Sequence, residues 1–262
     1  MPLRDFNSQR LFVDAALASG AGIECSAGQA NYLLNVLRLT AGDTILVFNG
    51  RDGEWRAAIE TRSRRACGLR IGELSRAQEG GPDIDYLFAP LKRTRLDYMV
   101  EKATELGVAR LRPVLTRRTI AERVNLERMR ANAVEAAEQC GILRIPEVVE
   151  PVKLERVLET WDAARQLIFC DEDAEIVNPI EALRQGVRPT LLACLRQDVS
   201  APSRTPLAVL IGPEGGFDPA EREMLLAKPY TIRISLGPRV MRADTAAIAA
   251  LALVNAVAGD WR

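Results

Sequence analysis

The sequence predicts an α/β protein of two domains, a small N-terminal β-barrel over residues 1–76 and an α/β domain over residues 84–262. Two observations carry this prediction. Up to residue 76, short apolar runs are separated by glycines, as in small barrels, whereas strand-like runs alternate with helical patterns from residue 84 onward. The segment AQEGGPD (77–83) between these regions has the composition of a linker. Since 48% of the 262 residues are hydrophobic, the chain can bury a core.

In the N-terminal region, the pattern predicts strands within residues 43–60 that are joined at the turn signals Asn49-Gly50 and Asp52-Gly53. A third strand follows at 68–74. One helix is expected over residues 28–39, because its leucines recur at helical spacing.

The C-terminal region is expected to contain five strands in alternation with helices. The expected strands are 84–90, 109–116, 166–170, 207–212 and 231–237, and the expected helices are 94–108, 125–140 and 245–257. Gly107 is the stop signal of the first of these helices. Such alternation predicts a mostly parallel sheet that is covered on both faces. The last helix is apolar nearly all round, which predicts packing against a second subunit as well as against the sheet.

Composition excludes several classes of site. The chain has no histidine, so Ser-His-Asp triads and His-based zinc sites are impossible. Its five cysteines are scattered without a CxxC pair, which predicts reduced thiols in a cytoplasmic protein and no metal site; they are Cys25, Cys67, Cys140, Cys170 and Cys194. No apolar stretch reaches the length of a membrane span, so no membrane association is expected.

Charge is segregated along the chain although the net charge is zero. Residues 92–130 hold eleven basic side chains against five acidic ones, whereas residues 131–223 hold nine against seventeen. A basic face on a neutral protein favours a polyanionic partner. Aromatic residues make up only 5% of the chain, which favours recognition of phosphates and shape over base stacking.

Two loops that each follow an apolar strand and contain Gly-Pro are the strongest candidates for a binding site. In the first, IGPEGGFDPAERE (211–223), glycines permit close approach of a ligand, and Asp218 caps a helix that has Pro219 at its first position. Glu214 within this loop disfavours a phosphate ligand. In the second, SLGPRVMRADTAAIAA (235–250), Val240 and Met241 are apolar residues suited to wall a pocket, and Asp244 or Thr245 starts the closing helix.

The pair of loops resembles the trefoil-knot (SPOUT) methyltransferases, and more closely their bacterial 16S ribosomal RNA uridine-N3 methyltransferase family. The resemblance extends along most of the chain. It includes RLFVD (10–14), NVLRLTAGDTILVFNG (35–50), the KATELGV helix within 92–119, and EAAEQCGILRIPEV (135–148). The sequence differs from the family pattern in lacking a histidine before VLRL, where Asn31 and Asn35 stand, in having Ile142 after EQCG, and in having Asp244 before Thr-Ala.

The resemblance implies a PUA-like RNA-binding β-barrel followed by a SPOUT α/β domain with a deep trefoil knot. It implies S-adenosyl-L-methionine as cofactor, an obligate homodimer, and 16S ribosomal RNA or the assembled 30S subunit as partner. The cofactor would be held by the two loops, through Ile211, Gly212, Pro213, Glu214, Gly215, Gly216, Leu236, Gly237, Val240, Met241 and Thr245.

Methylation at uridine N3 requires loss of the imide proton or stabilisation of the resulting anion. Without histidine, arginines are the candidates for stabilising the anion, and a carboxylate or water for accepting the proton. The catalytic candidates are Arg242, Arg239 and Asp244, with Glu214 as a further carboxylate.

Contacts with RNA are expected from arginines and lysines that lack interleaved acids; these are Arg51, Arg64, Arg65, Lys92, Arg93, Arg95, Arg117 and Arg118. Two alternatives remain open: a SPOUT methyltransferase with another RNA target, and a non-catalytic RNA-binding factor of ribosome assembly.

Overall fold

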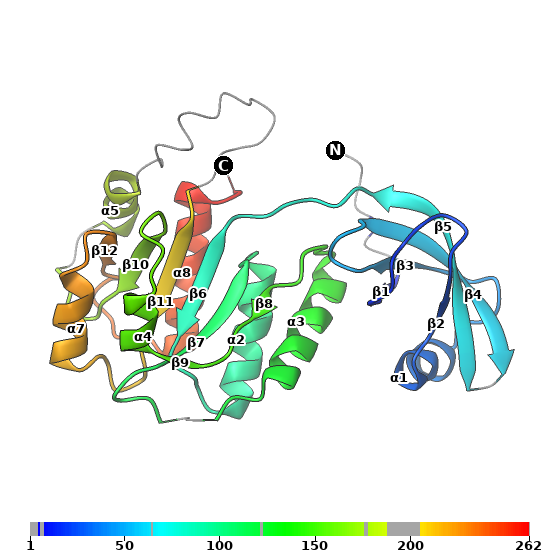
Figure 1. Cartoon of the computed structure of the whole chain (residues 1–262), viewed down its shortest axis with the longest axis horizontal. Helices are drawn as coiled ribbons and strands as arrows, with labels where there is room; N and C mark the ends of the chain where they lie inside the picture. Colours follow the sequence, from blue (N-terminus) through cyan, green and yellow to red (C-terminus); the bar gives the residue numbers. More distant parts are fainter. Residues whose placement is uncertain are drawn as a thin grey trace. The chain divides into compact units, whose positions relative to one another are not determined.

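The chain folds into two compact units (Figure 1). A computed structural model describes residues 5, 8–63, 65–120, 123–175, 178–187 and 205–261. The first unit comprises Met1–Gly80 together with Ala137–Ile145, and the second comprises Gly81–Ala136 and Pro146–Arg262. The division at Gly80 falls inside the expected linker, whereas the sequence pattern does not assign residues 137–145 to the first unit. Cys194 and Arg64 lie outside the described residues.

A five-stranded sheet of order β1-β3-β4-β5-β2 forms the first unit. Its strands are β1 (Arg10–Phe12), β2 (Gly22–Glu24), β3 (Thr44–Phe48), β4 (Glu54–Ser63) and β5 (Ala66–Arg76). β1 pairs parallel with β3, and the remaining pairs are antiparallel. The turn signals between β3 and β4 are confirmed, since Gly50 and Gly53 have φ of +82° and +85°, which glycine adopts without strain.

The helix expected over residues 28–39 is shorter than predicted. Ser26 caps α1 (Ala27–Asn31), and the chain continues as one π-helical turn, η1 (Tyr32–Val36). Arg38 has a positive φ of 58°, which no α-helix tolerates, so residues 37–39 leave the helix although they still pack against the core.

A buried ion network ties together the ends of this sheet and residues 137–145. The Glu54 carboxylate, 1% exposed, accepts hydrogen bonds from Arg10 Nε and from Arg76 Nε and Nη2, each at 3.0 Å. Arg76 also donates to the carbonyl oxygen of Gly141 at 2.8 Å. One carboxylate therefore neutralises two arginines that water does not reach.

The second unit is built on a parallel sheet of order β12-β10-β11-β6-β7-β8, with β9 paired to β7 (Figure 1). The strands are β6 (Ile84–Phe88), β7 (Arg110–Leu115), β8 (Glu147–Val148), β9 (Val152–Lys153), β10 (Gln166–Cys170), β11 (Leu207–Ile211) and β12 (Thr231–Ile234). The strand pairs among the described residues of this sheet are parallel, and β6 and β11 are buried along their whole length. The predicted parallel sheet is confirmed.

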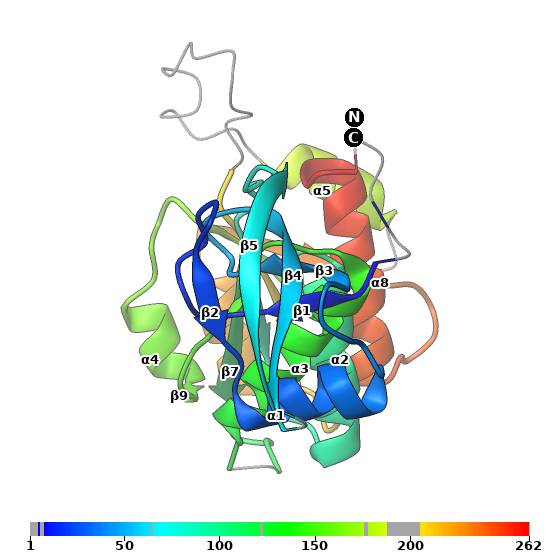
Figure 2. The same cartoon turned by 90° about the vertical axis from the view of Figure 1, so that its right-hand side faces the viewer.

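Helices cover both faces of this sheet (Figure 2). They are α2 (Arg93–Glu105), α3 (Leu126–Cys140), α4 (Leu154–Glu159), α5 (Pro179–Gly186), α7 (Pro219–Leu226) and α8 (Ala243–Ala258). α4 and α7 pack on the face that carries Leu87, Phe169 and Leu210. α2 and α8 pack against each other on the opposite face, where Tyr86 of β6 contacts Met99 of α2. None of the described helices is long and apolar enough to cross a membrane.

The closing helix α8 starts earlier than the sequence predicts. Arg242, not Asp244 or Thr245, is its N-cap residue, and it makes no side-chain capping bond. Asp244 instead lies in the first turn, where a negative charge is favourable, and its carboxylate accepts a hydrogen bond from the Thr245 amide at 2.9 Å.

The ion network predicts a large stability loss for Glu54→Ala, because two buried arginines would lose their counter-charge. We expect a loss of about 3–5 kcal/mol in unfolding free energy. The matched control is Glu60→Ala, which removes an exposed pair with Arg70 and should have a much smaller effect. Urea unfolding followed by amide hydrogen exchange of β4 and β5 reports on this unit alone, and equal losses in the two variants would contradict the prediction.

Candidate active site

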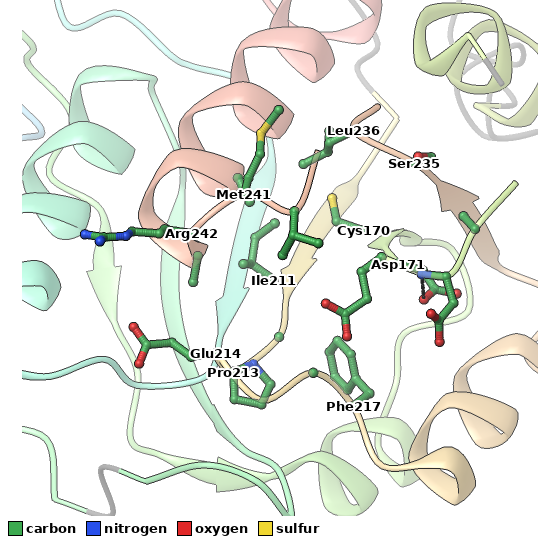
Figure 3. A pocket seen from close by; sticks show the side chains of 18 of the residues that line it. Cys170, Asp171, Ile211, Pro213, Glu214, Phe217, Ser235, Leu236, Met241 and Arg242 are labelled. Atoms are coloured by element: carbon green, nitrogen blue, oxygen red, sulfur yellow. Dashed lines mark hydrogen bonds between the residues drawn. The ribbon is translucent and has the colours of Figure 1, made fainter. Parts of the chain in front are cut away.

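A cavity of about 580 Å³ lies in the second unit at the carboxyl ends of β10, β11 and β12 (Figure 3). Three segments line it: residues 170–174 after β10, the loop 212–218 after β11 (the first loop), and the loop 235–242 after β12 (the second loop). Because the three strands are neighbours and parallel, their following loops must meet at one edge of the sheet, which is where open α/β sheets bind ligands.

Close packing shapes the first loop. The Phe217 ring lies so close to Gly212 that any side chain at this position would overlap it. Gly216 has φ of +68°, its amide donates to the carbonyl oxygen of Pro213 at 2.9 Å, and the Glu172 carboxylate occupies the space of a Cβ. The predicted helix start is confirmed: Asp218 caps α7 in a capping box with Glu221, and proline follows the cap.

The second loop presents an apolar surface to the cavity. Gly237 has φ of +104°, and its amide donates to Ser235 Oγ at 3.2 Å. Leu236 and Met241 are two of the loop's apolar side chains that line the cavity (Figure 3). Val240 also lines the cavity and is 87% exposed, an unusual position for a large apolar side chain.

Residues 170–174 were missed by sequence reasoning. The run Asp171-Glu172-Asp173 is indistinguishable from a solvated acidic loop when read alone. The signal available in the sequence was that this run directly follows the apolar strand 166–170. In the structure this strand is β10, which lies between β11 and β12 in the sheet. Burial raises the pKa of the Cys170 thiol to about 12, so this cysteine remains a neutral wall of the cavity and no nucleophile.

Arginines pair with the first and the last carboxylate of the acidic run. Asp171 is buried and accepts hydrogen bonds from Arg222 Nε at 2.9 Å and Arg233 Nε at 2.6 Å. Arg222 also pairs with the Asp173 carboxylate at 2.9 Å. These bonds hold the segment after β10 against α7 and β12.

The two glutamates of the cavity differ in their surroundings. Glu214 is paired with Arg95 of α2, and both residues line the cavity. Glu172 has no hydrogen bond or ion pair to any described residue. Its carboxylate is therefore available to accept hydrogen bonds from a ligand.

Most of the predicted cofactor-binding and catalytic residues lie around this cavity. Those that line it are Ile211, Gly212, Pro213, Glu214, Gly216, Leu236, Gly237, Arg239, Val240, Met241 and Arg242. Gly215, Asp244 and Thr245 are not among the lining residues. The Arg242 guanidinium is directed away from the side formed by Cys170 and Asp171 (Figure 3). Further lining residues that were not among the predicted site residues are Phe217, Arg222, Ser235, Pro238, Ala243 and Ala246.

The predicted RNA-binding residues have varied environments. Arg51 donates to the carbonyl oxygen of Asp14 at 2.7 Å. Lys92, Arg93 and Arg65 have exposed side chains.

Three further predicted RNA-binding residues are engaged within the second unit. Arg95 pairs with Glu214, Arg117 Nη1 contacts Asp218 at 2.8 Å, and Arg118 Nη1 donates to the carbonyl oxygen of Gly215 at 2.8 Å. Within the described residues, no group of three or more cysteines and carboxylates is arranged to hold a metal ion.

Comparison with known proteins identifies both units. The RNA methyltransferase domain family matches residues 79–255, and the RNA methyltransferase PUA domain family matches residues 26–71. A ribosomal RNA small subunit methyltransferase E from Synechocystis is 31% identical over 95% of this chain and 77% of its own length. Its counterpart from Rickettsia conorii is 28% identical over 94% of both chains.

Solved structures share the complete fold. A methyltransferase from Legionella pneumophila, described in complex with its cofactor SAM, has a TM-score of 0.79 at 26% identity and covers 97% of this chain and 99% of its own. A ribosomal RNA small subunit methyltransferase E from Neisseria gonorrhoeae, bound to S-adenosyl methionine, has a TM-score of 0.79 at 22% identity, with 98% and 100% covered.

The fold and the family matches define an enzyme of the RNA methyltransferase class, with a PUA domain followed by an α/β RNA methyltransferase domain. The chain belongs to the RNA methyltransferase family whose domain spans residues 79–255. The predicted enzyme class and the resemblance to methyltransferases of small-subunit ribosomal RNA are thereby confirmed, while methylation at uridine N3 and the trefoil knot stay predictions.

The two adjacent glycines of the first loop provide a test of its geometry. We expect Gly216→Ala to destabilise the second unit by about 1–3 kcal/mol, because it forces a side chain into positive φ and against Glu172. Gly215→Ala is the matched control, since its Cβ would only meet the Arg118 side chain at 3.8 Å. Amide hydrogen exchange of β11 and α7 measures the difference, and indistinguishable variants would refute the loop geometry.

Proposed function

We propose that this chain is an S-adenosyl-L-methionine-dependent methyltransferase that methylates N3 of a uridine in 16S ribosomal RNA of the small subunit. The observation that carries the proposal is the cavity between two glycine-containing loops, with the free carboxylate of Glu172 at its wall. Relatives across the whole chain are named for methylation of small-subunit ribosomal RNA, and the Legionella protein is described with SAM.

The residues present fit this cofactor. When bound, S-adenosylmethionine supplies an electrophilic methyl group on a positively charged sulfur. Its ammonium, sulfonium and ribose hydroxyls suit a site with carboxylates, and it has no phosphate for Glu172 or Glu214 to repel. Gly212 and Gly216 lack the side chains that would fill the site, and Leu236, Val240 and Met241 offer apolar contacts to an adenine ring. Backbone groups of both loops would hold the remaining polar atoms.

Methylation at uridine N3 would break the N–H bond and the S–CH₃ bond of the cofactor and would form an N–CH₃ bond, with the proton passing to an acceptor and a neutral thioether as the leaving group. A guanidinium beside the uracil oxygens would stabilise the anion that develops when N3 loses its proton. Arg242 is our first choice for this role and Arg239 the second, because both line the cavity from the second loop. Positioning of N3 against the methyl group would supply much of the remaining rate enhancement.

Two carboxylates are candidates for accepting the proton. Asp244, the choice from sequence, lies in the first turn of α8 and is occupied by the Thr245 amide. Glu214 lines the cavity, which favours it as the acceptor, either directly or through water, and its ion pair with Arg95 holds the carboxylate in place.

RNA binding would use the exposed cations Arg51, Arg65, Lys92 and Arg93. The substrate would be naked 16S ribosomal RNA or the assembled 30S subunit.

We also propose that the protein is a homodimer and that it acts in the cytoplasm. The half-buried Ile248, Leu253 and Val257 of α8 offer an apolar contact for a second copy. A different RNA target and a non-catalytic role in ribosome assembly remain the alternatives.

The first test is binding of S-adenosylmethionine by calorimetry. The wild-type protein should bind one cofactor per chain, and Glu172→Gln should weaken binding about tenfold, because it removes a charged hydrogen-bond acceptor. Glu175→Gln is the matched control, since Glu175 is an exposed neighbour that does not line the cavity. Absence of wild-type binding at millimolar cofactor would favour the assembly-factor alternative.

The second test addresses the target atom and Arg242 together. N3 lies on the Watson–Crick edge of uridine, so its methylation should stop reverse transcriptase at that nucleotide. We expect such a stop at one uridine of 16S RNA after reaction with either bare 16S RNA or 30S subunits as substrate. Arg242→Met should lower kcat about 100-fold, because one stabilising donor is lost, with less than about twofold change in cofactor affinity.

Arg156→Met serves as control, because it removes an exposed arginine paired with Glu159 on α4. Methylation without a reverse transcriptase stop would place the methyl group elsewhere than N3. Full activity of Arg242→Met would exclude Arg242 from the chemistry.

A further inference from the structure

The turn after β7 is bonded to the first loop across about a hundred residues of sequence. Its residues Thr116 and Thr119 close it, since the Thr119 amide donates to the Thr116 carbonyl at 3.1 Å and the Thr116 amide donates to Thr119 Oγ1 at 2.8 Å. The two side chains between them, Arg117 and Arg118, both reach the first loop. The turn therefore has a defined conformation and supports the first loop, and it is not a free basic segment.

Arg117 is bonded to the start of α7. Its backbone amide donates to Glu221 Oε1 at 2.8 Å, and its guanidinium contacts Asp218 Oδ1 at 2.8 Å. Glu221 is fully buried and also accepts the Asp218 amide at 3.1 Å, so its carboxylate joins the turn and the cap of α7. The far end of the first loop is thus held by this turn.

Arg118 acts on the middle of the loop. Its Nη1 donates to the carbonyl oxygen of Gly215 at 2.8 Å, and it is not among the residues that line the cofactor cavity. It lines a small separate cleft with Lys92 and Ile120, on which Pro213 and Glu214 also border. The first loop therefore separates Arg118 from the cavity.

The bond to Gly215 fixes the orientation of one peptide plane. The Gly215 carbonyl and the Gly216 amide belong to the same planar unit and point in opposite directions. With the carbonyl held by Arg118, the amide is directed to the Pro213 carbonyl, and Gly216 takes the positive φ that places it against Glu172. Two consecutive glycines offer little resistance to rotation of this plane, so the bond from Arg118 adds to the bond inside the loop in selecting one orientation.

We infer that Arg118 is a positioning residue of the cofactor cavity: its guanidinium holds the Gly215–Gly216 peptide in the orientation that binds S-adenosylmethionine. The inference rests on the proposed function for the identity of the cofactor. It replaces a direct RNA contact, the role that the basic sequence around Arg118 predicts, by an action through the first loop.

The test compares cofactor affinity, RNA kinetics and loop exchange in Arg118→Met. We expect the Kd for S-adenosylmethionine, measured by calorimetry without RNA, to rise about five- to tenfold. At saturating cofactor, kcat and the KM for RNA should stay within about twofold of wild type. Arg118→Lys should restore most of the affinity, because an ammonium group can still donate to the Gly215 carbonyl.

Arg156→Met, the exposed arginine on α4, is the matched control and should change none of these quantities. An unchanged cofactor Kd in Arg118→Met with a raised KM for RNA would overturn the inference and make Arg118 an RNA contact. Amide hydrogen exchange of Gly216 without any ligand gives an independent readout, which should be faster in Arg118→Met than in wild type. If wild-type protein binds no cofactor, the proposed function fails, whereas unchanged Gly216 exchange would refute the role of Arg118.

Discussion

The site depends on the order of three parallel strands. β12, β10 and β11 are neighbours in the sheet although residues 166–170, 207–211 and 231–234 are far apart in sequence, so the three segments that follow them meet at one edge. Covering helices bury both faces of the sheet and thereby hold these strand ends in place. Two glycine-containing loops and one acidic segment can then enclose a cavity while their backbone groups remain available to a ligand.

Features that depend on local chemistry were predictable from the sequence. The cap at Asp218, the turns at Gly50 and Gly53, and the apolar strands 84–88 and 207–211 each follow from residue type and spacing. Features that depend on the order of strands in the sheet were not predictable from the sequence. Asp171 and Glu172 belong to the cavity only because β10 lies between β11 and β12, and no periodicity in the sequence reveals that order. The start of α8 was misplaced for a related reason, since Asp244 satisfies its neighbour's amide from inside the first turn instead of capping the helix.

Arginine content was informative about charge but not about the partner of each side chain. Arg95, Arg117 and Arg118 lie in the most basic part of the sequence, which suits RNA. In the fold, carboxylates and a carbonyl of the first loop bind all three. A guanidinium suits this use, because its several donors can join a loop to a distant turn while its charge remains in part accessible. Basic composition therefore overstates how much of a surface is available to nucleic acid.

Because the chain has no histidine, the carboxylates and arginines of the cavity must fill both its structural and its chemical roles. Asp171 and Asp173 are neutralised by Arg222 and Arg233, so their role is to hold the segment after β10. Glu214 faces Arg95, with which it forms an ion pair at the wall of the cavity. In the proposed reaction, an arginine such as Arg242 would stabilise the anion that remains when the imide proton leaves, so that no strong base would be needed. Arginine and carboxylate side chains alone would then carry the proton transfer, and the way in which the two loops are held would set the affinity for the cofactor.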